Sequence, residues 1–159
     1  MLVACGTVPP EQYRHPRIAQ AKANLFKHER DASPSGQEVT IFALTLLNTG
    51  YVFGGAKNPE AGLDCSGFVT YVYAHAVNIT LKGNAASLAQ QGKHVSVDNL
   101  RSGDLVFFNT LGHSFSHVGI YIGNGNFIHA PNSRGKIRID EMSNRYWSYR
   151  FETGRTLLN

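Results

Sequence analysis

The sequence predicts an α+β fold, in which helices from the first half of the chain pack on a mainly antiparallel sheet from the second half. Between residues 39 and 76, apolar side chains recur with the 3.6-residue period of amphipathic helices. In the second half this period is lost: residues 104–108 predict a strand, and residues 116–122 alternate between apolar and other side chains, which is typical of a half-buried strand. The sequence Gly123-Asn124-Gly125-Asn126 is typical of a tight hairpin turn, so the strands on either side are expected to be antiparallel.

Four helices are expected in the first part of the chain. Residues 17–30 predict a short amphipathic helix, and the next helix is expected to be capped near Ser35. That second helix should end at residues 48–50, because Asn48-Thr49-Gly50 is typical of a left-handed helix stop. A third helix begins at Cys65, and residues 85–91 predict a short fourth one. The apolar stripe of the third helix comprises positions 65, 68, 69, 72, 73 and 76.

The strands are expected at residues 104–108, 116–122, 127–130, 136–139 and 149–151. The second of these alternates most clearly. One side carries Val118, Ile120 and Ile122, and the other carries His117, Gly119 and Tyr121. We therefore expect the apolar side of this strand to face the core and the histidine side to face a site.

The composition is that of one globular domain. Of the 159 residues, 42% are hydrophobic and 16% are charged, which is enough for a single core. The net charge is +4, but the Lys and Arg residues are scattered without a run of five like charges. We therefore expect no nucleic-acid binding, and attraction to an anionic polymer fits this charge better. No stretch approaches the ~18 apolar residues that a transmembrane helix needs.

The N-terminus resembles the cleavage box of a bacterial lipoprotein signal. In Met1-Leu2-Val3-Ala4-Cys5-Gly6, a Leu-x-Ala-Cys pattern precedes a cysteine that would carry the lipid. The charged and long apolar parts of such a signal are missing, so the sequence leaves lipid attachment at Cys5 and a chance match both open. Residues 6–16 contain three prolines and predict a tether. We divide the chain into residues 1–16, the lipobox-like start and tether, and residues 17–159, a single domain.

Cys65 is the first candidate for chemistry. It is expected at a helix N-terminus, where the helix dipole and unpaired backbone N–H groups favour a thiolate. The alternative is a structural role, because cysteines are among the most buried residue types. Polar neighbours Asp64 and Ser66 favour the functional interpretation. Asp64 is also a candidate helix cap, and its charge opposes formation of the thiolate.

Two histidines are candidates to assist this thiol. A thiol attacks an acyl carbon as a thiolate, so it needs an imidazole to take its proton and a polar group to orient that imidazole. His117 opens a predicted strand and His129 lies on its hairpin partner. A cysteine on an early helix with a histidine on a later sheet is the papain-like division of labour. The backbone N–H of Cys65 can then contribute to an oxyanion hole.

The distance between the two histidines depends on the hairpin register. A two-residue turn would set His129 opposite Ile120, on the core face. A three-residue turn would set it opposite Tyr121, on the face of His117, but about 13 Å along the strand. A strong twist or a bulge would then have to shorten the gap. Ideal pairing places Asn132 or Ser133 across from His117 instead, so Asn132 is the alternative orienting residue.

Five sequence blocks, in this order, resemble the NlpC-type cell-wall cysteine endopeptidases of bacteria over residues 38–155. The blocks are Tyr51-Val52-Phe53-Gly54-Gly55, Asp64-Cys65-Ser66-Gly67-Phe68-Val69, Gly103-Asp104-Leu105-Val106-Phe107-Phe108, Ser116-His117-Val118-Gly119-Ile120-Tyr121-Ile122-Gly123 and Phe127-Ile128-His129-Ala130. The resemblance implies a papain-like α+β fold and a catalytic domain over residues 17–159. It implies hydrolysis of peptide bonds in peptidoglycan stem peptides, first the γ-D-glutamyl–diamino acid bond and, in some relatives, D-alanyl cross-links.

The resemblance also implies a role for each candidate. Cys65 would be the nucleophile, His117 the base and His129 the orienting third residue. The substrate-binding residues would be Tyr51, Asp64 and Ser66. We expect no cofactor, no metal, a monomer and a place in the bacterial envelope on the periplasmic side. An outer-membrane lipoprotein anchored through Cys5 is the most specific form of that hypothesis.

Three other hypotheses use the same residues. An acyltransferase or amidase of the same superfamily would form the same acyl-enzyme and pass it to a different acceptor. A wall-binding lipoprotein would keep the fold without turnover, although it would not need the cysteine and both histidines. A zinc ion held by Cys65, His117 and His129 is the third hypothesis.

Overall fold

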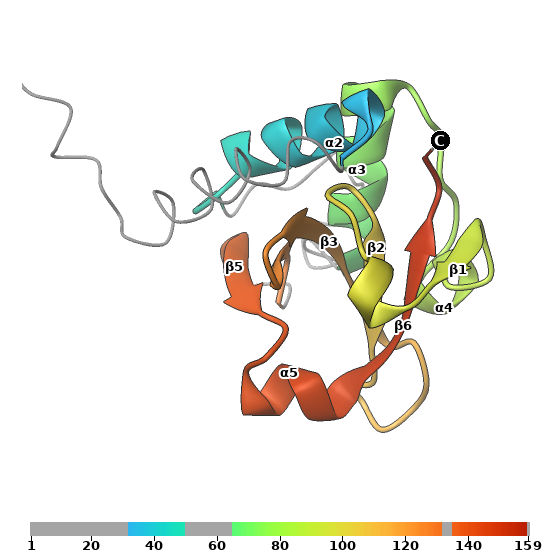
Figure 1. Cartoon of the computed structure of the whole chain (residues 1–159), viewed down its shortest axis with the longest axis vertical. Helices are drawn as coiled ribbons and strands as arrows, with labels where there is room; N and C mark the ends of the chain where they lie inside the picture. The colour runs from blue at the N-terminus through green and yellow to red at the C-terminus, as the bar shows by residue number, and fades with distance from the viewer. Residues whose placement is uncertain (1–31, 50–64, 132–134, 159) are drawn as a thin grey trace, which may run out of the picture.

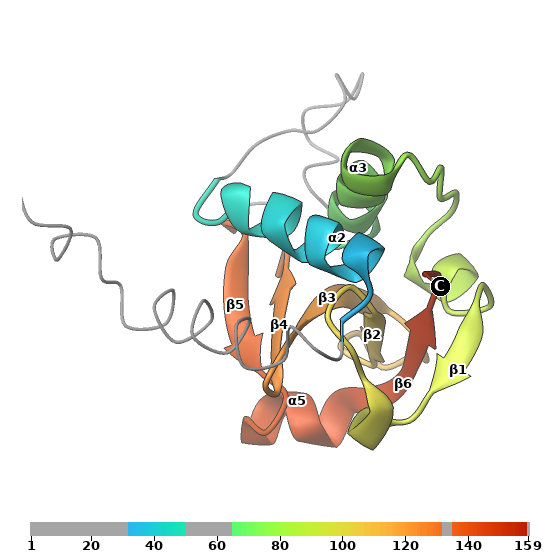
Figure 2. The same ribbon diagram turned by 45° about the horizontal axis from the view of Figure 1, so that its top comes forward.

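The computed structural model describes residues 32–49, 65–131 and 135–158. Helices α2 (Pro34–Thr45) and α3 (Cys65–Val77) lie on the same side of a sheet, with the short helix α4 (Ala85–Leu88) near its edge (Figures 1 and 2). The predicted tether, the helix over residues 17–30 and the segment 50–64 lie outside the described residues, so these expectations stay predictions. Among the described helices, none has both the length and the apolar character that a membrane crossing needs.

Six antiparallel strands form the sheet, in the order β1-β6-β2-β3-β4-β5. Their bounds are Lys93–Val95 for β1, Leu105–Phe108 for β2, His117–Gly123 for β3, Asn126–His129 for β4, Arg138–Glu141 for β5 and Phe151–Thr156 for β6. A 3-10 turn, η4 (Val97–Asn99), follows β1. Helices packed on an antiparallel sheet confirm the predicted α+β class.

Local signals in the sequence account for both long helices. Ser33 caps α2 by accepting a hydrogen bond from the Gly36 backbone N–H, and Pro34 occupies the first turn, where its missing N–H costs nothing. The cap therefore lies two residues before the predicted one. Asn48 has a φ of 65°, which fits the predicted left-handed turn, but α2 itself ends at Thr45, three residues before the predicted stop. Helix α3 begins at Cys65, as predicted, and buries the expected apolar stripe against the sheet.

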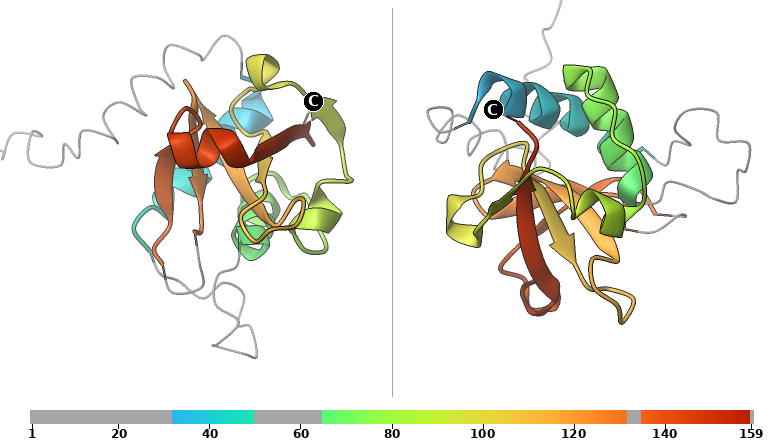
Figure 3. Two further views of the ribbon diagram at one scale, coloured as in Figure 1. Left: turned by 90° about the horizontal axis from the view of Figure 1, so that it is seen from below. Right: turned by 90° about the vertical axis from the view of Figure 1, so that its right-hand side faces the viewer.

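The two faces of the sheet are covered differently. The main core lies between the sheet and helices α2, α3 and α4, and its residues are mostly aliphatic. On the opposite side, helix α5 (Arg145–Arg150) crosses the strands, as the view from below shows (Figure 3). A smaller cluster lies under α5 and comprises Val106, Phe108, Phe127, Met142 and Trp147. We call it the aromatic cluster.

Two sheet predictions need correction. The strand predicted over residues 149–151 is wrong, because Tyr149 and Arg150 belong to α5 and β6 begins at Phe151. The Asn144 side chain accepts from the Tyr146 backbone N–H and starts this helix locally. Strand β1 has no alternating apolar pattern and was not predicted. It exists at the sheet edge because its backbone pairs with β6.

Candidate active site

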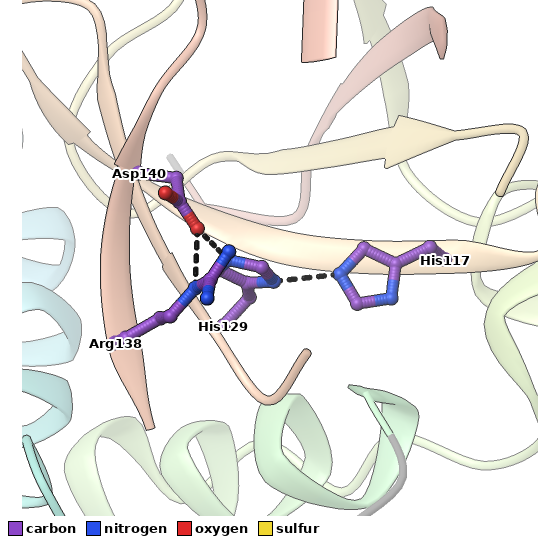
Figure 4. Close-up of polar contacts among 4 residues, drawn as sticks. All are labelled: His117, His129, Arg138 and Asp140. Carbon is purple, nitrogen blue, oxygen red and sulfur yellow. Dashed lines mark hydrogen bonds and ion pairs between the residues drawn. The ribbon is translucent and has the colours of Figure 1, made fainter. Parts of the chain in front are cut away.

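Two buried histidines on neighbouring strands form the centre of the site. His117 is the first residue of β3 and is 5% exposed, and His129 is the last residue of β4 and is fully buried. The Nε2 atom of His117 lies 2.8 Å from the Nδ1 atom of His129 (Figure 4). The structure therefore brings the two histidines into direct hydrogen-bond contact, and His129 occupies the orienting position beside His117.

A bulge in β3 sets this arrangement. From the turn outward, the paired residues are Gly123 and Asn126, Tyr121 and Phe127, and Ile120 and Ile128. The register shifts between Tyr121 and Gly123, so the extra residue lies in the strand and not in the turn. Neither register considered from the sequence is correct. The observed register, continued by one pair, sets His129 opposite Gly119, two residues rather than four from the level of His117.

Gly119 leaves the space that this contact requires. A Cβ atom at this position would lie 2.8 Å from the Phe127 ring and 3.2 Å from the Cβ of His129. The absence of a side chain therefore lets the imidazole of His129 lean across β3 toward His117.

A carboxylate on the next strand extends the row. The Oδ2 atom of Asp140 lies 2.8 Å from Nε2 of His129, so both ring nitrogens of His129 are engaged. The Nε atom of Arg138 donates to the same Oδ2 at 2.7 Å. Figure 4 shows His117, His129 and Asp140 in line, with Arg138 beside the carboxylate. We call His117, His129 and Asp140 the His–His–Asp row.

Asp140 was not identified from the sequence, although a signal was present. The strand predicted at residues 136–139 continues its alternation by one residue, which puts Asp140 on the same side as Arg138. In the structure Arg138 pairs with His129 and Asp140 with Phe127 across β4 and β5. Extending that strand by one residue would have brought a carboxylate to the His129 side of the sheet.

Trp147 of α5 covers both imidazoles. Its ring stacks on His117 with centroids 5.5 Å apart and meets His129 edge-on at 4.9 Å. Phe127 also contacts His129, at 4.6 Å between ring centroids. Trp147 was not identified either, although it is the only tryptophan of the chain and follows a helix-capping asparagine. These rings keep the two imidazoles away from bulk water, whereas Asp140 is partly exposed.

Burial controls the protonation of this row. It lowers the pKa of His117 to about 3, with a further lowering from His129 and an opposing effect of the Asp140 charge. Burial also lowers the pKa of His129, against the hydrogen bond and charge of Asp140. Burial alone would raise the pKa of Asp140, but its hydrogen bonds from His129 and Arg138 lower it overall. At neutral pH both imidazoles are therefore neutral and Asp140 is ionised.

The candidate nucleophile lies on the helix that packs against the histidine strand. Cys65 is the first residue of α3, is half-buried and contacts the main core. Helix α3 packs against β3, which begins with His117. Ser66 is buried at the same helix end. Because Nε2 of His117 is engaged with His129, its Nδ1 atom is the nitrogen left to exchange a proton with a thiol.

The remaining predicted site residues lie outside the described parts of the chain. These are Tyr51 and Asp64, the alternative orienting residue Asn132, and Cys5. Within residues 32–49, 65–131 and 135–158, no group of three or more His, Cys, Asp or Glu side chains is arranged to hold a metal ion.

Comparison with known proteins relates this site to one family. The model of the NlpC/P60 family matches residues 48–156, which include the whole His–His–Asp row and Cys65. Over 109 residues the chain is 41% identical to the murein DD-endopeptidase MepS/murein LD-carboxypeptidase of Escherichia coli (strain K12), covering 69% of this chain and 56% of that protein. Over 119 residues it is 40% identical to the gamma-DL-glutamyl hydrolase of Bacillus subtilis (strain 168), covering 73% of this chain and 28% of that protein.

The chain thus spans about half the length of the first of these relatives and less of the second. A crystal structure of an NlpC/P60 family protein from Bacillus cereus ATCC 10987 matches the fold with a TM-score of 0.67 at 26% identity. That match covers 81% of this chain and 42% of the other. The predicted papain-like α+β fold is confirmed by this similarity.

Proposed function

Because this chain belongs to the NlpC/P60 family, we propose that it is a cysteine endopeptidase that hydrolyses peptide bonds in peptidoglycan stem peptides. The observation that carries the proposal is the hydrogen-bonded pair of buried histidines at the start of the strand on which the Cys65 helix packs. The name of the Escherichia relative, a murein endopeptidase, supports the substrate class, and the name of the Bacillus relative, a gamma-DL-glutamyl hydrolase, supports hydrolysis of γ-glutamyl bonds.

The proposed reaction uses Cys65, His117 and His129. Nδ1 of His117 takes the proton of the Cys65 thiol, and the thiolate attacks the carbonyl carbon of the scissile bond. The resulting oxyanion would accept hydrogen bonds at the N-terminus of α3, to which the backbone N–H of Cys65 can contribute. The intermediate collapses to a thioester, and the leaving amine takes the proton from His117. Water, deprotonated by His117, then releases the acid and restores the thiol.

The proposal also names two candidates for the bond that is cut. The γ-D-glutamyl–diamino acid bond is the first candidate, and the name of the Bacillus relative supports its γ-glutamyl part. The D-alanyl cross-link is the second, supported by the name of the Escherichia relative. In either case Tyr51, Asp64 and Ser66 would hold the substrate. The carboxylate of Asp64 suits the free amine of a stem peptide better than it suits activation of the thiol.

We further propose that the protein works in the bacterial envelope, where its substrate lies. A net charge of +4 favours a polymer that carries carboxylates. If Cys5 carries a lipid, residues 6–16 would tether the domain within about 35 Å of a membrane. Mass spectrometry of the native protein would find a diacylglyceryl group on Cys5, or show an unmodified thiol and remove the anchor from the proposal.

The activity is tested by digestion of purified peptidoglycan and of defined muropeptides, with the products identified by mass spectrometry. The unaltered protein is expected to release stem-peptide fragments whose masses give the scissile bond, and Cys65→Ala is expected to release none. His94→Ala, at an exposed histidine on β1, is the matched control and should keep full activity.

Three outcomes would contradict the proposal. Cleavage by Cys65→Ala would exclude a thiol mechanism. Transfer of the acyl group to an added amine, in place of hydrolysis, would indicate an acyltransferase. A Cys65 thiol that reacts slowly with iodoacetamide, in a protein that binds peptidoglycan without cutting it, would indicate a wall-binding protein.

A further inference from the structure

The hydrogen bonds of the His–His–Asp row can run in only one direction. An ionised carboxylate accepts hydrogen bonds and donates none, so the hydrogen between Asp140 and His129 must lie on Nε2 of His129. A neutral imidazole carries one hydrogen, so Nδ1 of His129 is then an acceptor. The contact of 2.8 Å between the two histidines therefore takes its hydrogen from Nε2 of His117. This leaves Nδ1 of His117 with a free lone pair.

We propose that Asp140 is a positioning residue of the active site: through His129 it fixes the tautomer of His117, so that Nδ1 is unprotonated and faces the thiol. This inference rests on the proposed function for its catalytic meaning. It adds a fourth residue, on a third strand, to the predicted cysteine and two histidines. Asp140 itself need not touch the substrate, because it acts through the ring of His129.

The pair of histidines alone would not define this direction. Two neutral imidazoles can share a hydrogen bond with either ring as donor. In the reversed arrangement, Nδ1 of His129 donates to Nε2 of His117, and the hydrogen of His117 then sits on Nδ1. Such a ring cannot take the proton of a thiol. Only the acceptor beyond His129 distinguishes the two arrangements, and in this structure that acceptor is Asp140.

Arg138 favours the same direction of the hydrogen bonds, from His117 through His129 to Asp140. Its guanidinium donates to the Oδ2 atom that accepts from His129, and together these contacts keep Asp140 ionised. The charge of Arg138 also opposes a second proton on His129, and burial opposes it further. A doubly protonated His129 would donate from both nitrogens and reverse its bond to His117. Arg138 is more than half exposed, so it helps to keep the Asp140 carboxylate ionised but does not shield it from water.

Asp140 also assists the step in which His117 becomes charged. When His117 holds the thiol proton, its Nε2–H still donates to the neutral His129, and the orientation of the row is unchanged. The negative charge of Asp140 favours the charged form of His117. No hydrogen has to move between the rings during the reaction, so the row stays in one arrangement through both half-reactions.

The test compares Asp140→Asn with Glu141→Gln in the full chain. Glu141 is the exposed neighbour on the same strand, so the control removes a charge of the same sign without entering the row. The Asn amide can donate to Nε2 of His129, which favours the reversed direction. We expect kcat on a defined muropeptide to fall by about 10² to 10⁴, as in other triads with a wrong imidazole tautomer. KM should stay within about twofold, since Asp140 does not hold substrate.

Two-dimensional ¹⁵N NMR of the imidazoles reads the tautomers directly. In the unaltered protein His117 should show a protonated Nε2 and a bare Nδ1, and Asp140→Asn should show the reverse or a mixture. Asp140→Glu, which restores a carboxylate acceptor, should recover the original tautomer at least in part. A purely structural role would lower stability without changing the tautomer.

The outcomes separate this inference from the proposed function. Unchanged kcat and an unchanged His117 tautomer in Asp140→Asn would overturn the inference, as would a His117 with a protonated Nδ1 and a bare Nε2 in the unaltered protein. The second measurement needs no variant, so it decides the matter even if Asp140→Asn fails to fold. If the unaltered protein cut no muropeptide but showed the expected tautomers, the proposed function would fail and the tautomer assignment would stand.

Discussion

The two faces of strand β3 are both buried, but they are built for different purposes. Val118, Ile120 and Ile122 face the main core, where side chains of α2, α3 and α4 surround them. His117 and Tyr121 face the opposite side, where the aromatic cluster and α5 cover them. One strand thus serves as the wall of an aliphatic core and as the support of a polar row.

The difference between these faces is the number of constraints on each side chain. An aliphatic core tolerates exchange of one apolar residue for another of similar volume. A buried polar row does not, since each donor needs an acceptor and an unpaired member is costly. The His–His–Asp row meets this condition through two hydrogen bonds of 2.8 Å and the ion pair to Arg138. We therefore expect the orientation of the two histidines to depend on the aromatic side of the sheet, and stability to depend mainly on the main core, whose helix α3 carries Cys65.

The largest expected effect on stability comes from the main core. Leu88 of α4 is fully buried there, and Leu88→Ala should lower the free energy of unfolding by about 2–5 kcal/mol, as lost burial and a cavity add together. The folded fraction should keep its kcat, because Leu88 belongs to α4, whereas Cys65 begins α3 and the His–His–Asp row lies on the other face of the sheet. Urea denaturation and steady-state kinetics under strongly native conditions check the two parts.

A drop in kcat of Leu88→Ala larger than the loss of folded protein would contradict the separation of the two faces. It would mean that packing of the helical layer controls the position of His117 through β3. Val97→Ala, at an exposed position in η4, is the control. It should change the free energy of unfolding by no more than about 0.5 kcal/mol and leave kcat unchanged.

The next prediction is that stability depends on pH, because of His117 on the face that carries the aromatic cluster. His117 has a lowered pKa of about 3 in the folded protein, so below pH 6.5 the unfolded chain binds a proton that the folded chain does not. Stability should therefore fall as the pH drops from 6.5 toward 3, by about 1.4 kcal/mol per pH unit for this one group. The lowered pKa of His129 acts in the same direction, and so does that of Asp140 at lower pH.

Urea denaturation at a series of pH values measures this slope. His117→Gln removes the titrating group and should flatten the curve between pH 6.5 and 4, whereas His94→Gln, at an exposed histidine, should leave the slope unchanged. An equally steep curve for His117→Gln would show that other groups cause the acid sensitivity.

The sequence predicted the site best where the signal is local. Cys65 was expected at the start of a helix from its neighbours and the apolar stripe behind it, and α3 does begin there. His117 was expected at the start of an alternating strand, and β3 begins at that residue. Both predictions depend on the chemistry of about ten consecutive residues, which one sequence contains in full.

The parts that were missed depend on contacts between segments. The bulge in β3 has no local marker, so the sequence alone left a gap of up to four residues between histidines that are in contact, and a bulge was named only as one way to shorten it. Asp140 acquires its role from the pairing of β4 with β5, and Trp147 from the packing of α5 over both imidazoles. No pattern within one segment specifies which strand neighbours another.

The last prediction tests the close approach of His129 to β3 at Gly119. Gly119→Ala places a Cβ against the Phe127 ring and the backbone oxygen of Ile128, so β4 has to move away from β3. We expect a cost of about 2 kcal/mol from this overpacking. We also expect a larger relative loss of kcat, because the same displacement stretches the hydrogen bond between His117 and His129.

The double variant Gly119→Ala, Phe127→Leu distinguishes two effects of the new Cβ atom, its contact with the Phe127 ring and its contact with His129. Removing the ring edge gives the new Cβ room, so the stability cost of the pair should be smaller than the sum of the two single costs. The contact with the Cβ of His129 at 3.2 Å remains, so kcat should recover less than stability does. Full recovery of kcat would mean that Gly119 merely avoids Phe127. Recovery of stability without kcat would show that Gly119 is required because His129 must reach across β3.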